Sequence, residues 1–157
     1  MENKPTFKIV LFTPEIPGNT GSIGRTCLAL NLELILIKPY GFDIDEKAVR
    51  RAGLDYWKHV KLREFDSWED FLLKEKPKKE KLLFFENNGK KSFYEAPYAA
   101  DCYLLFGGET KGFPYQVEEE YTENFYHLPM YSEHIRSLNL SNVATTVAYQ
   151  CLGKLSV

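Results

Sequence analysis

The sequence has few cysteines, no long apolar run and no strong excess of either charge. Its 157 residues include three cysteines, Cys27, Cys102 and Cys151, which form no C-x-x-C pair and give an odd count. This pattern excludes a disulfide framework and favours a reducing cytoplasm. The opening residues MENKPTFK contain no apolar signal core, and no stretch approaches the roughly 20 apolar residues of a membrane span. We therefore expect a cytoplasmic protein with no membrane partner.

Motifs for metal binding and for hydrolysis are also lacking. His59, His127 and His134 show no ligand spacing with one another or with the cysteines, so we expect no metal site. The chain has no G-x-S-x-G motif, no P-loop and no G-x-G-x-x-G motif, which argues against serine hydrolases and these two nucleotide-binding loops. His127 is interpreted as a satisfied core or interface histidine, and His134 as a polar loop residue.

The formal net charge of −2 excludes a general polyanion binder. Residues 1–100 carry 17 basic and 15 acidic side chains, whereas residues 101–157 carry 3 and 7. If the protein binds RNA, a local patch must do so, and we expect that patch in the first hundred residues. The run EKPKKEK (75–81) has two interpretations, a solvated link between a helix and a strand or a contact to an RNA backbone.

Apolar residues make up 44% of the chain, which suits one compact domain over residues 1–157. Short apolar runs are typical of buried parallel strands, and one further segment alternates like a half-exposed strand. The expected strands are 8–12, 32–38, 59–65, 82–86, 102–106 and 125–129. The expected helices are 21–31, one capped by Asp43 and closed by Gly53, one capped by Ser67 that runs to about Lys76, 114–121, and one capped by Ser141 that runs to Leu152. This alternation predicts an α/β domain with a mostly parallel sheet flanked by helices.

Three unusual loops begin where expected strands end. They are TPEIPGNTGSIGR (13–25), GGETKGFP (107–114) and MYSEHIRSLNLSN (130–142). The carboxyl ends of parallel strands share one edge, where ligands gather, so the three loops should lie on one rim. Two arginines with several amides and hydroxyls suit a phosphate-bearing ligand or RNA. The candidate residues on this rim are Asn19, Arg25, Glu109, Lys111, His134, Arg136, Ser137, Asn139 and Asn142.

Two features of the rim have more than one interpretation. Gly107 and Gly108 suit either a plain strand-to-loop turn or a cradle in which the backbone approaches a ligand. Glu15 and Glu109 could pair as an acid and a base, although nothing in the sequence fixes their separation. The simpler interpretation is that Glu109 accepts hydrogen bonds from backbone amides.

Three segments resemble the motifs of the SpoU (SPOUT-class) RNA 2′-O-methyltransferases in order and in spacing. They are PEIPGNTGSIGRTCLAL, LLFGGETKGFP and LPMYSEHIRSLNLSNVATTVAYQ. The segment YGFDIDEKAVRRAGLDYW is similar to one compact branch, the tRNA (cytidine/uridine) 2′-O-methyltransferases that act on the wobble nucleotide of leucine tRNAs. The resemblance covers nearly the whole chain. It implies methyl transfer from S-adenosylmethionine to a ribose 2′-hydroxyl of tRNA.

The resemblance also implies a structure and a set of site residues. It implies a homodimer and a C-terminal deep trefoil knot, with the cofactor bent within the knotted loops and the Gly107–Gly112 turn against its adenosine. By position, the cofactor contacts fall on Phe85, Gly107, Leu128 and Ser137. Arg25 matches the residue that activates and orients the ribose hydroxyl. The resemblance further implies five residues that shape the site or contact RNA: Asn19, Glu109, Arg136, Asn139 and Asn142.

Two alternatives to this function remain open at this point. A methyltransferase of the same fold could act on another RNA, such as ribosomal RNA. A non-catalytic RNA-binding module is the other, although the intact Arg25 and SLNLSN (137–142) argue against it. One departure from the family lies between Met130 and Arg136, where this chain is one residue longer than usual.

Overall fold

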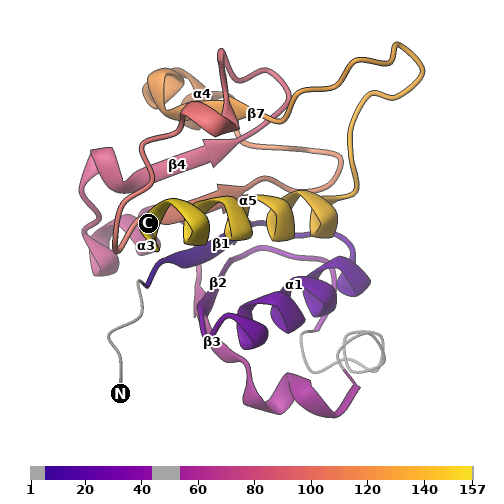
Figure 1. Ribbon diagram of the computed structural model, residues 1–157. Helices are drawn as coiled ribbons and strands as arrows, with labels where there is room; N and C mark the ends of the chain where they lie inside the picture. The colour runs from indigo at the N-terminus through magenta and orange to yellow at the C-terminus, as the bar shows by residue number, and fades with distance from the viewer. Residues whose placement is uncertain (1–5, 44–53, 157) are drawn as a thin grey trace.

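The computed structural model describes residues 6–43 and 54–156 (Figure 1). The strands are β1 (Lys8–Phe12), β2 (Glu33–Ile37), β3 (Lys61–Phe65), β4 (Leu82–Phe85), β5 (Lys91–Ser92), β6 (Tyr103–Phe106) and β7 (Phe125–His127). The helices are α1 (Pro17–Ala29), α3 (Trp68–Glu75), α4 (Tyr115–Glu120) and α5 (Leu140–Leu155), with short 3₁₀ helices η1 (Leu54–His59), η2 (Lys79–Lys81), η3 (Phe93–Glu95) and η4 (Thr122–Asn124). The helix expected before Gly53 lies outside the described residues.

The strands form one sheet in the order β3-β2-β1-β6-β4-β7-β5, and every pairing between them is parallel. The expected parallel α/β fold is confirmed. Near the middle of the sheet Val10 of β1 pairs with Ile35 of β2 on one side and Leu105 of β6 on the other. Because the strands are parallel, their carboxyl ends all lie along the same rim of the sheet. The short strand β5 has no apolar run, which is why the sequence pattern did not reveal it.

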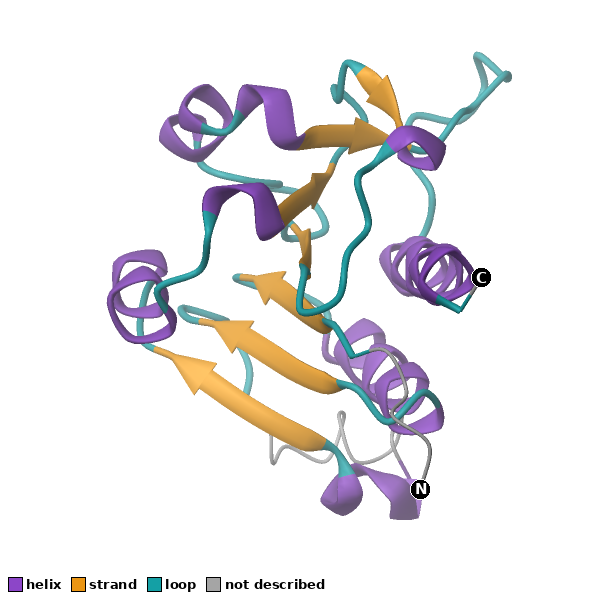
Figure 2. Ribbon diagram, turned by 60° about the vertical axis from the view of Figure 1, so that its left-hand side comes forward, coloured by secondary structure: helices purple, strands orange, loops and turns teal. Residues whose placement is uncertain are grey.

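Alternate residues of the central strands pack into two separate apolar clusters, one on each face of the sheet. Ile9 and Leu11 lie in the cluster that includes Ile23 and Cys27 of α1 and Ala144, Val147, Ala148 and Cys151 of α5. Val10 and Phe12 lie in the other cluster, which includes Trp68 and Phe71 of α3 and Val117 of α4. Figure 2 shows these two pairs of helices on opposite sides of the sheet. Because burial of one large apolar side chain contributes roughly 1.5–3 kcal/mol, this double burial holds the rim strands firmly in place.

The helix starts differ from the expectations at two places on the rim. α1 begins at Pro17 rather than near residue 21, because proline fits the first helical turn, where its missing N–H costs nothing. α5 begins two residues earlier than expected and is capped by Asn139, whose side chain accepts from the N–H groups of Ser141 and Asn142. Ser141 is therefore not the cap. The expected cap of α3 is confirmed, since Ser67 Oγ accepts from Asp70 N at 3.0 Å.

The lysine-rich run at 75–81 joins α3 to β4 and is largely exposed, as a solvated link would be. Lys81 Nζ donates to Ala100 O at 3.0 Å, and Lys79 lies over the ring of Tyr121 at 5.5 Å. Its role as an RNA contact stays a prediction, as does the trefoil knot. Within the described part of the chain, no helix is long and apolar enough to cross a membrane.

Candidate active site

A cavity of about 280 Å³ opens at the carboxyl ends of the central strands. Its walls come from the chain that follows β1, β4, β6 and β7, so the expected convergence of the three loops on one rim is confirmed. The lining residues are Ile16, Asn19, Phe85, Glu86, Asn87, Phe106, Gly107, Gly108, Glu109, Leu128, Ser137, Leu138, Asn139, Leu140 and Val143. The cavity wall thus combines apolar side chains, most of them from strand ends and α5, with polar side chains from the loops.

The four residues expected to contact a cofactor all line this one cavity. Phe85 ends β4, Gly107 follows β6, Leu128 follows β7, and Ser137 lies in the loop before α5. Of the site-shaping candidates, Asn19, Glu109 and Asn139 line it as well. Arg25, Arg136 and Asn142 do not appear in its wall.

The glycine turn after β6 is closed by backbone contact. Gly108 N donates to Gly112 O at 3.3 Å, and Gly112 N donates to Gly108 O at 2.9 Å. A Cβ built on Gly107 would stand 2.5 Å from the carbonyl carbon of Gly112, and Gly112 itself has φ of 62°. The close backbone approach within the turn therefore requires a glycine at position 107. Its backbone still lines the cavity.

Two glutamates fasten the first loop to this glycine turn. The Glu109 carboxylate accepts from Glu15 N and Ile16 N, both at 2.8 Å, and from Asn19 Nδ2 at 3.0 Å. The Glu15 carboxylate accepts in return from Thr110 N at 2.7 Å, from Thr110 Oγ1 at 2.5 Å and from Lys111 N at 3.2 Å. The interpretation of Glu109 as an acceptor of backbone amides is confirmed. The bonds from Thr110 lower the pKa of Glu15 because they stabilise its ionised form.

Asn139 connects this pair of loops to the third. Asn139 Nδ2 donates to Asn19 Oδ1 at 3.3 Å, while Asn139 Oδ1 accepts from Ser141 N at 3.0 Å at the start of α5. Asn19 is buried in the first turn of α1 and uses its other side-chain atom on Glu109. One chain of hydrogen bonds therefore runs across all three loops and sets their spacing around the cavity.

Arg25 lies outside the cavity wall, on an exposed face of α1. Its guanidinium carbon is 5.5 Å from the ring centroid of Tyr56 in η1, a cation–π distance. Such a contact restrains the direction of a long side chain while leaving its five N–H donors available to an anionic substrate.

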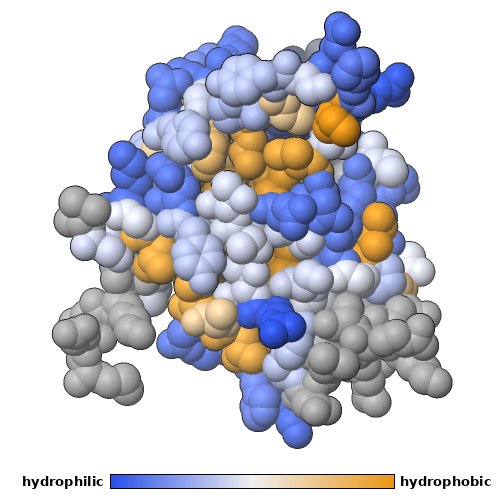
Figure 3. Space-filling view, turned by 45° about the vertical axis from the view of Figure 1, so that its right-hand side comes forward, coloured by the Kyte–Doolittle hydropathy of each residue, from blue (hydrophilic) through white to orange (hydrophobic). Residues whose placement is uncertain are grey.

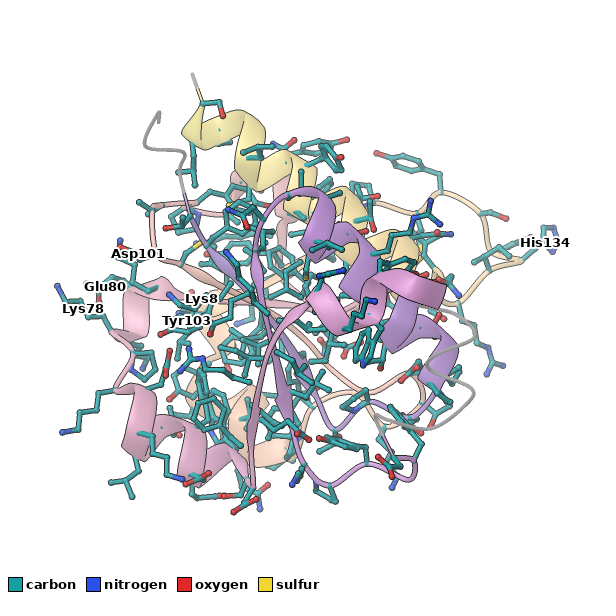
Figure 4. All side chains as sticks on the ribbon, turned by 90° about the horizontal axis from the view of Figure 1, so that it is seen from below. Lys8, Lys78, Glu80, Asp101, Tyr103 and His134 are labelled. Atoms are coloured by element: carbon teal, nitrogen blue, oxygen red, sulfur yellow. The ribbon has the colours of Figure 1, made fainter. Side chains whose placement is uncertain are left out.

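The loop before α5 extends away from the body of the protein. All residues from 131 to 139 are exposed, and Tyr131 is 97% accessible. Figure 1 shows this loop as an outstretched arm, and Figure 4 shows His134 at its outer tip. Asn87 Nδ2 donates to Arg136 O at 2.9 Å and so ties the base of the arm to the turn after β4. His134 is a loop residue, as expected.

The cavity wall contains two carboxylates, Glu86 and Glu109, and no lysine, arginine or histidine. Burial raises the pKa of Glu86, and the neighbouring Glu118 carboxylate adds to this, while the amide of Asn87 partly offsets it. The described part of the chain holds no cluster of three or more metal-ligating side chains. His127 Nδ1 lies 2.7 Å from Gly89 O, so that histidine is satisfied structurally, as expected.

Glu86 and Asn87 also line this wall, although neither was expected there from the sequence. Both come directly after the apolar run of β4, at the carboxyl end of a strand in the middle of the sheet. That position is the available signal, because ligand sites of parallel sheets gather there. No unusual loop composition accompanied it, and Glu86 was expected only as the last residue of the strand 82–86.

Comparison with known proteins gives a consistent result. Residues 6–149 match the model of the SpoU rRNA methylase family. A protein of Saccharophagus degradans (strain 2-40), named tRNA (cytidine(34)-2′-O)-methyltransferase, is 40% identical over 150 residues, covering 95% of this chain and 96% of that protein. A structure solved for insight into the 2-OH methylation of C/U34 on tRNA is 37% identical with a TM-score of 0.87, and 97% of each chain is covered.

A more distant structure supports the fold. The SpoU methyltransferase AviRb from Streptomyces viridochromogenes, solved in complex with the cofactor AdoMet, has a TM-score of 0.83 at 20% identity. The match covers 98% of this chain and 62% of that one. The architecture described above is therefore shared well beyond the range of clear sequence similarity.

Proposed function

The chain belongs to the SpoU rRNA methylase family, and from this premise we propose that it is an S-adenosylmethionine-dependent tRNA 2′-O-methyltransferase. The methyl group goes to the ribose 2′-hydroxyl of the wobble nucleotide, C or U. Support for this position comes from the relatives named for position 34 of tRNA, which align over nearly the whole chain. The finer proposal, that the substrates are leucine tRNAs, rests on the similarity of residues 40–57 to that branch.

The residues of the cavity fit S-adenosylmethionine. Phe85, Phe106 and Leu128 offer apolar surface for an adenine ring, and the glycine turn offers backbone N–H and C=O groups without side chains. Two carboxylates without a basic neighbour in the wall suit a ligand that carries positive charge. We propose that Phe85, Gly107, Leu128 and Ser137 hold this cofactor.

When bound, the cofactor supplies a methyl group activated by its sulfonium. The protein contributes position and charge. Arg25 activates and orients the ribose hydroxyl by donating hydrogen bonds from its guanidinium and by stabilising negative charge near the reacting oxygen. Asn19 and Arg136 shape the site, and Glu109, Asn139 and Asn142 hold the loops that surround it.

We propose that the active form is a homodimer. Tyr149 on α5 is 53% exposed, and Ile16 and Leu138, next to the cavity, are 48% and 45% exposed. Figure 3 shows hydrophobic residues uncovered among hydrophilic ones on the face that it turns forward. A second subunit would cover such a surface and could bring a further arginine to the cavity. Light scattering at micromolar concentration tests this, and a monomer that retains activity would contradict it.

The cellular location follows from the substrate and from the thiols. A tRNA-modifying enzyme works in the cytoplasm. Cys27, Cys102 and Cys151 are all free thiols, although Cys102 Sγ and Cys151 Sγ lie only 3.8 Å apart. Free thiols this close suit the reducing cytoplasm.

One observation carries the proposal: the four cofactor positions implied by the family line a single cavity together with the loops of all three motifs. The test is a nucleoside map of RNA from a strain that lacks this protein. We expect loss of one 2′-O-methylnucleotide at the wobble position of leucine tRNAs. A loss confined to ribosomal RNA would instead support the same chemistry on the alternative substrate.

A further inference from the structure

Glu86 is a cavity residue whose side chain the fold does not explain. Its backbone is well explained, because Glu86 N donates to Tyr126 O and Glu86 O accepts from Gly89 N, both at 3.0 Å. These bonds place residue 86 at the start of a turn. They would be the same for almost any side chain, so they leave the carboxylate unexplained.

The carboxylate of Glu86 faces the glycine turn. A Cβ built on Gly112 would stand 2.9 Å from Glu86 Oε2, so this oxygen lies directly against the Gly112 backbone. Glu86 Oε1 accepts only the amide of Asn87, at 3.2 Å. Among residues 6–43 and 54–156, no basic side chain forms an ion pair with Glu86.

The contrast with Glu109, the other carboxylate of the wall, is informative. Glu109 accepts three hydrogen bonds at 2.8–3.0 Å, which hold its charge in place and satisfy both oxygens. Glu86 is half-buried with one weak bond, and burial raises its pKa. An ionised carboxylate in such a place is unfavourable until an opposite charge arrives.

Resting on the proposed function, we propose that Glu86 is a specificity-determining residue that makes the cavity prefer the positively charged methyl donor over its neutral, demethylated product. The donor and the product differ by one methyl group and one unit of positive charge at sulfur. Glu86 is one of the residues that line the cavity, so its charge acts on a ligand bound there. The preference therefore depends on charge rather than on one particular contact.

The size of the effect follows from Coulomb's law. For charges about 6 Å apart, effective dielectric constants between about 80 and 20 correspond to roughly 3-fold to 100-fold in affinity. This gain in affinity applies only to the ligand that carries the positive charge at sulfur. It favours release of the product after each transfer, because the charge that Glu86 attracts disappears from sulfur when the methyl group leaves.

The test measures binding by calorimetry for three ligands: S-adenosylmethionine, S-adenosylhomocysteine and sinefungin, in which an amine-bearing carbon replaces the methylsulfonium. Glu86→Gln keeps the shape and removes the charge. We expect it to weaken S-adenosylmethionine and sinefungin by roughly 3-fold or more while changing S-adenosylhomocysteine by less than about 2-fold. Glu120→Gln, which removes an exposed carboxylate of α4, is the matched control and should leave all three affinities unchanged.

Other outcomes overturn the proposal in distinguishable ways. Equal weakening of all three ligands would mean that Glu86 contacts the shared adenosine or amino-acid part, and the charge preference would be wrong. Unchanged affinities for all three would remove Glu86 from the site. If the wild-type protein binds none of the three, the proposed function fails first, and this inference fails with it.

Discussion

Gly107 lies so close to the backbone of Gly112 in the turn after β6 that it tolerates no side chain without a shift of the backbone. A Cβ on Gly107 would meet the Gly112 carbonyl carbon at 2.5 Å, well inside van der Waals contact. Gly107→Ala should therefore destabilise the protein and weaken binding of S-adenosylmethionine, because the turn that lines the cavity must open. Thermal unfolding and calorimetry measure the two effects.

Gly153→Ala is the matched control for this change. Gly153 lies near the end of α5, and a Cβ built on it meets no atom within 4 Å. Alanine there should stabilise the helix by about 0.5–1 kcal/mol and leave cofactor binding unchanged. If Gly107→Ala behaved like Gly153→Ala, the close backbone approach would not be a requirement of the turn.

Arg25 gives the second prediction at the scale of single residues. Because Arg25 does not line the cavity, Arg25→Ala should leave the affinity for S-adenosylmethionine close to that of the wild type. The single-turnover rate of methylation should fall on the order of 100-fold or more, since the lost interaction belongs to the transition state.

Arg25→Lys separates charge from geometry. Lysine keeps the positive charge but lacks the planar set of donors, so a near-complete loss of rate would show that geometry matters. Much retained activity would show that charge alone suffices. Methylation by Arg25→Ala at the wild-type rate would mean that the catalytic role belongs to another residue.

At the scale of elements, the start of α5 distinguishes two residues that look alike in sequence. Asn139 and Ser141 are both good N-cap residues, and only the structure shows that Asn139 accepts from Ser141 N and Asn142 N. Asn139→Ala should cost about 1 kcal/mol from the cap, and more if the bond to Asn19 contributes. Ser141→Ala should cost clearly less, and urea unfolding of both variants compares them. Equal losses would contradict the assignment of the cap.

Glu15 gives a prediction that depends on pH. Its pKa is lowered in the folded protein by the hydroxyl and amide of Thr110, so its stabilising contribution is present above the unfolded value of about 4.5 and disappears as pH falls through the folded pKa. Wild-type protein should thus be more stable than Glu15→Gln at neutral pH, and this difference in stability should become smaller in acid. Thermal unfolding of both proteins from neutral pH down to pH 3 measures the difference. A gap that stays constant down to pH 3 would mean that the Glu15 charge is not what joins the loops.

Local patterns predicted the elements well and the contacts between loops poorly. Apolar runs such as 8–12 and 102–106 are buried on both faces, so the sequence carries their pattern directly. By contrast, the bonds from Glu15 and Ile16 to Glu109 join residues more than 90 positions apart, and no local rule anticipates them. Glu86 was missed because no unusual loop composition marks it, although it directly follows the buried strand β4. The four cofactor positions came from the family resemblance, because Phe85 and Leu128 look like ordinary core residues.

At the scale of the whole molecule, the sheet, the cavity and the charge distribution fit one activity. The two faces of the sheet are packed by separate helix pairs, so the rim carries the polar residues on which ligand binding can depend. The net charge of −2 leaves phosphate contacts to local groups rather than to the overall field. Substrate choice therefore depends on how the rim, and in a dimer the second rim, fits the folded tRNA.

The most direct test of this account is methyl transfer by the purified protein. The protein is incubated with S-adenosylmethionine labelled in its methyl group and with tRNA from a strain that lacks the protein, and the labelled nucleotide is located by nuclease digestion. We predict one labelled ribose, methylated at the 2′-oxygen of the wobble nucleotide of leucine tRNAs, and no label with Arg25→Ala. Label on a base, or no label in tRNA while wild-type protein binds the cofactor, would contradict the account.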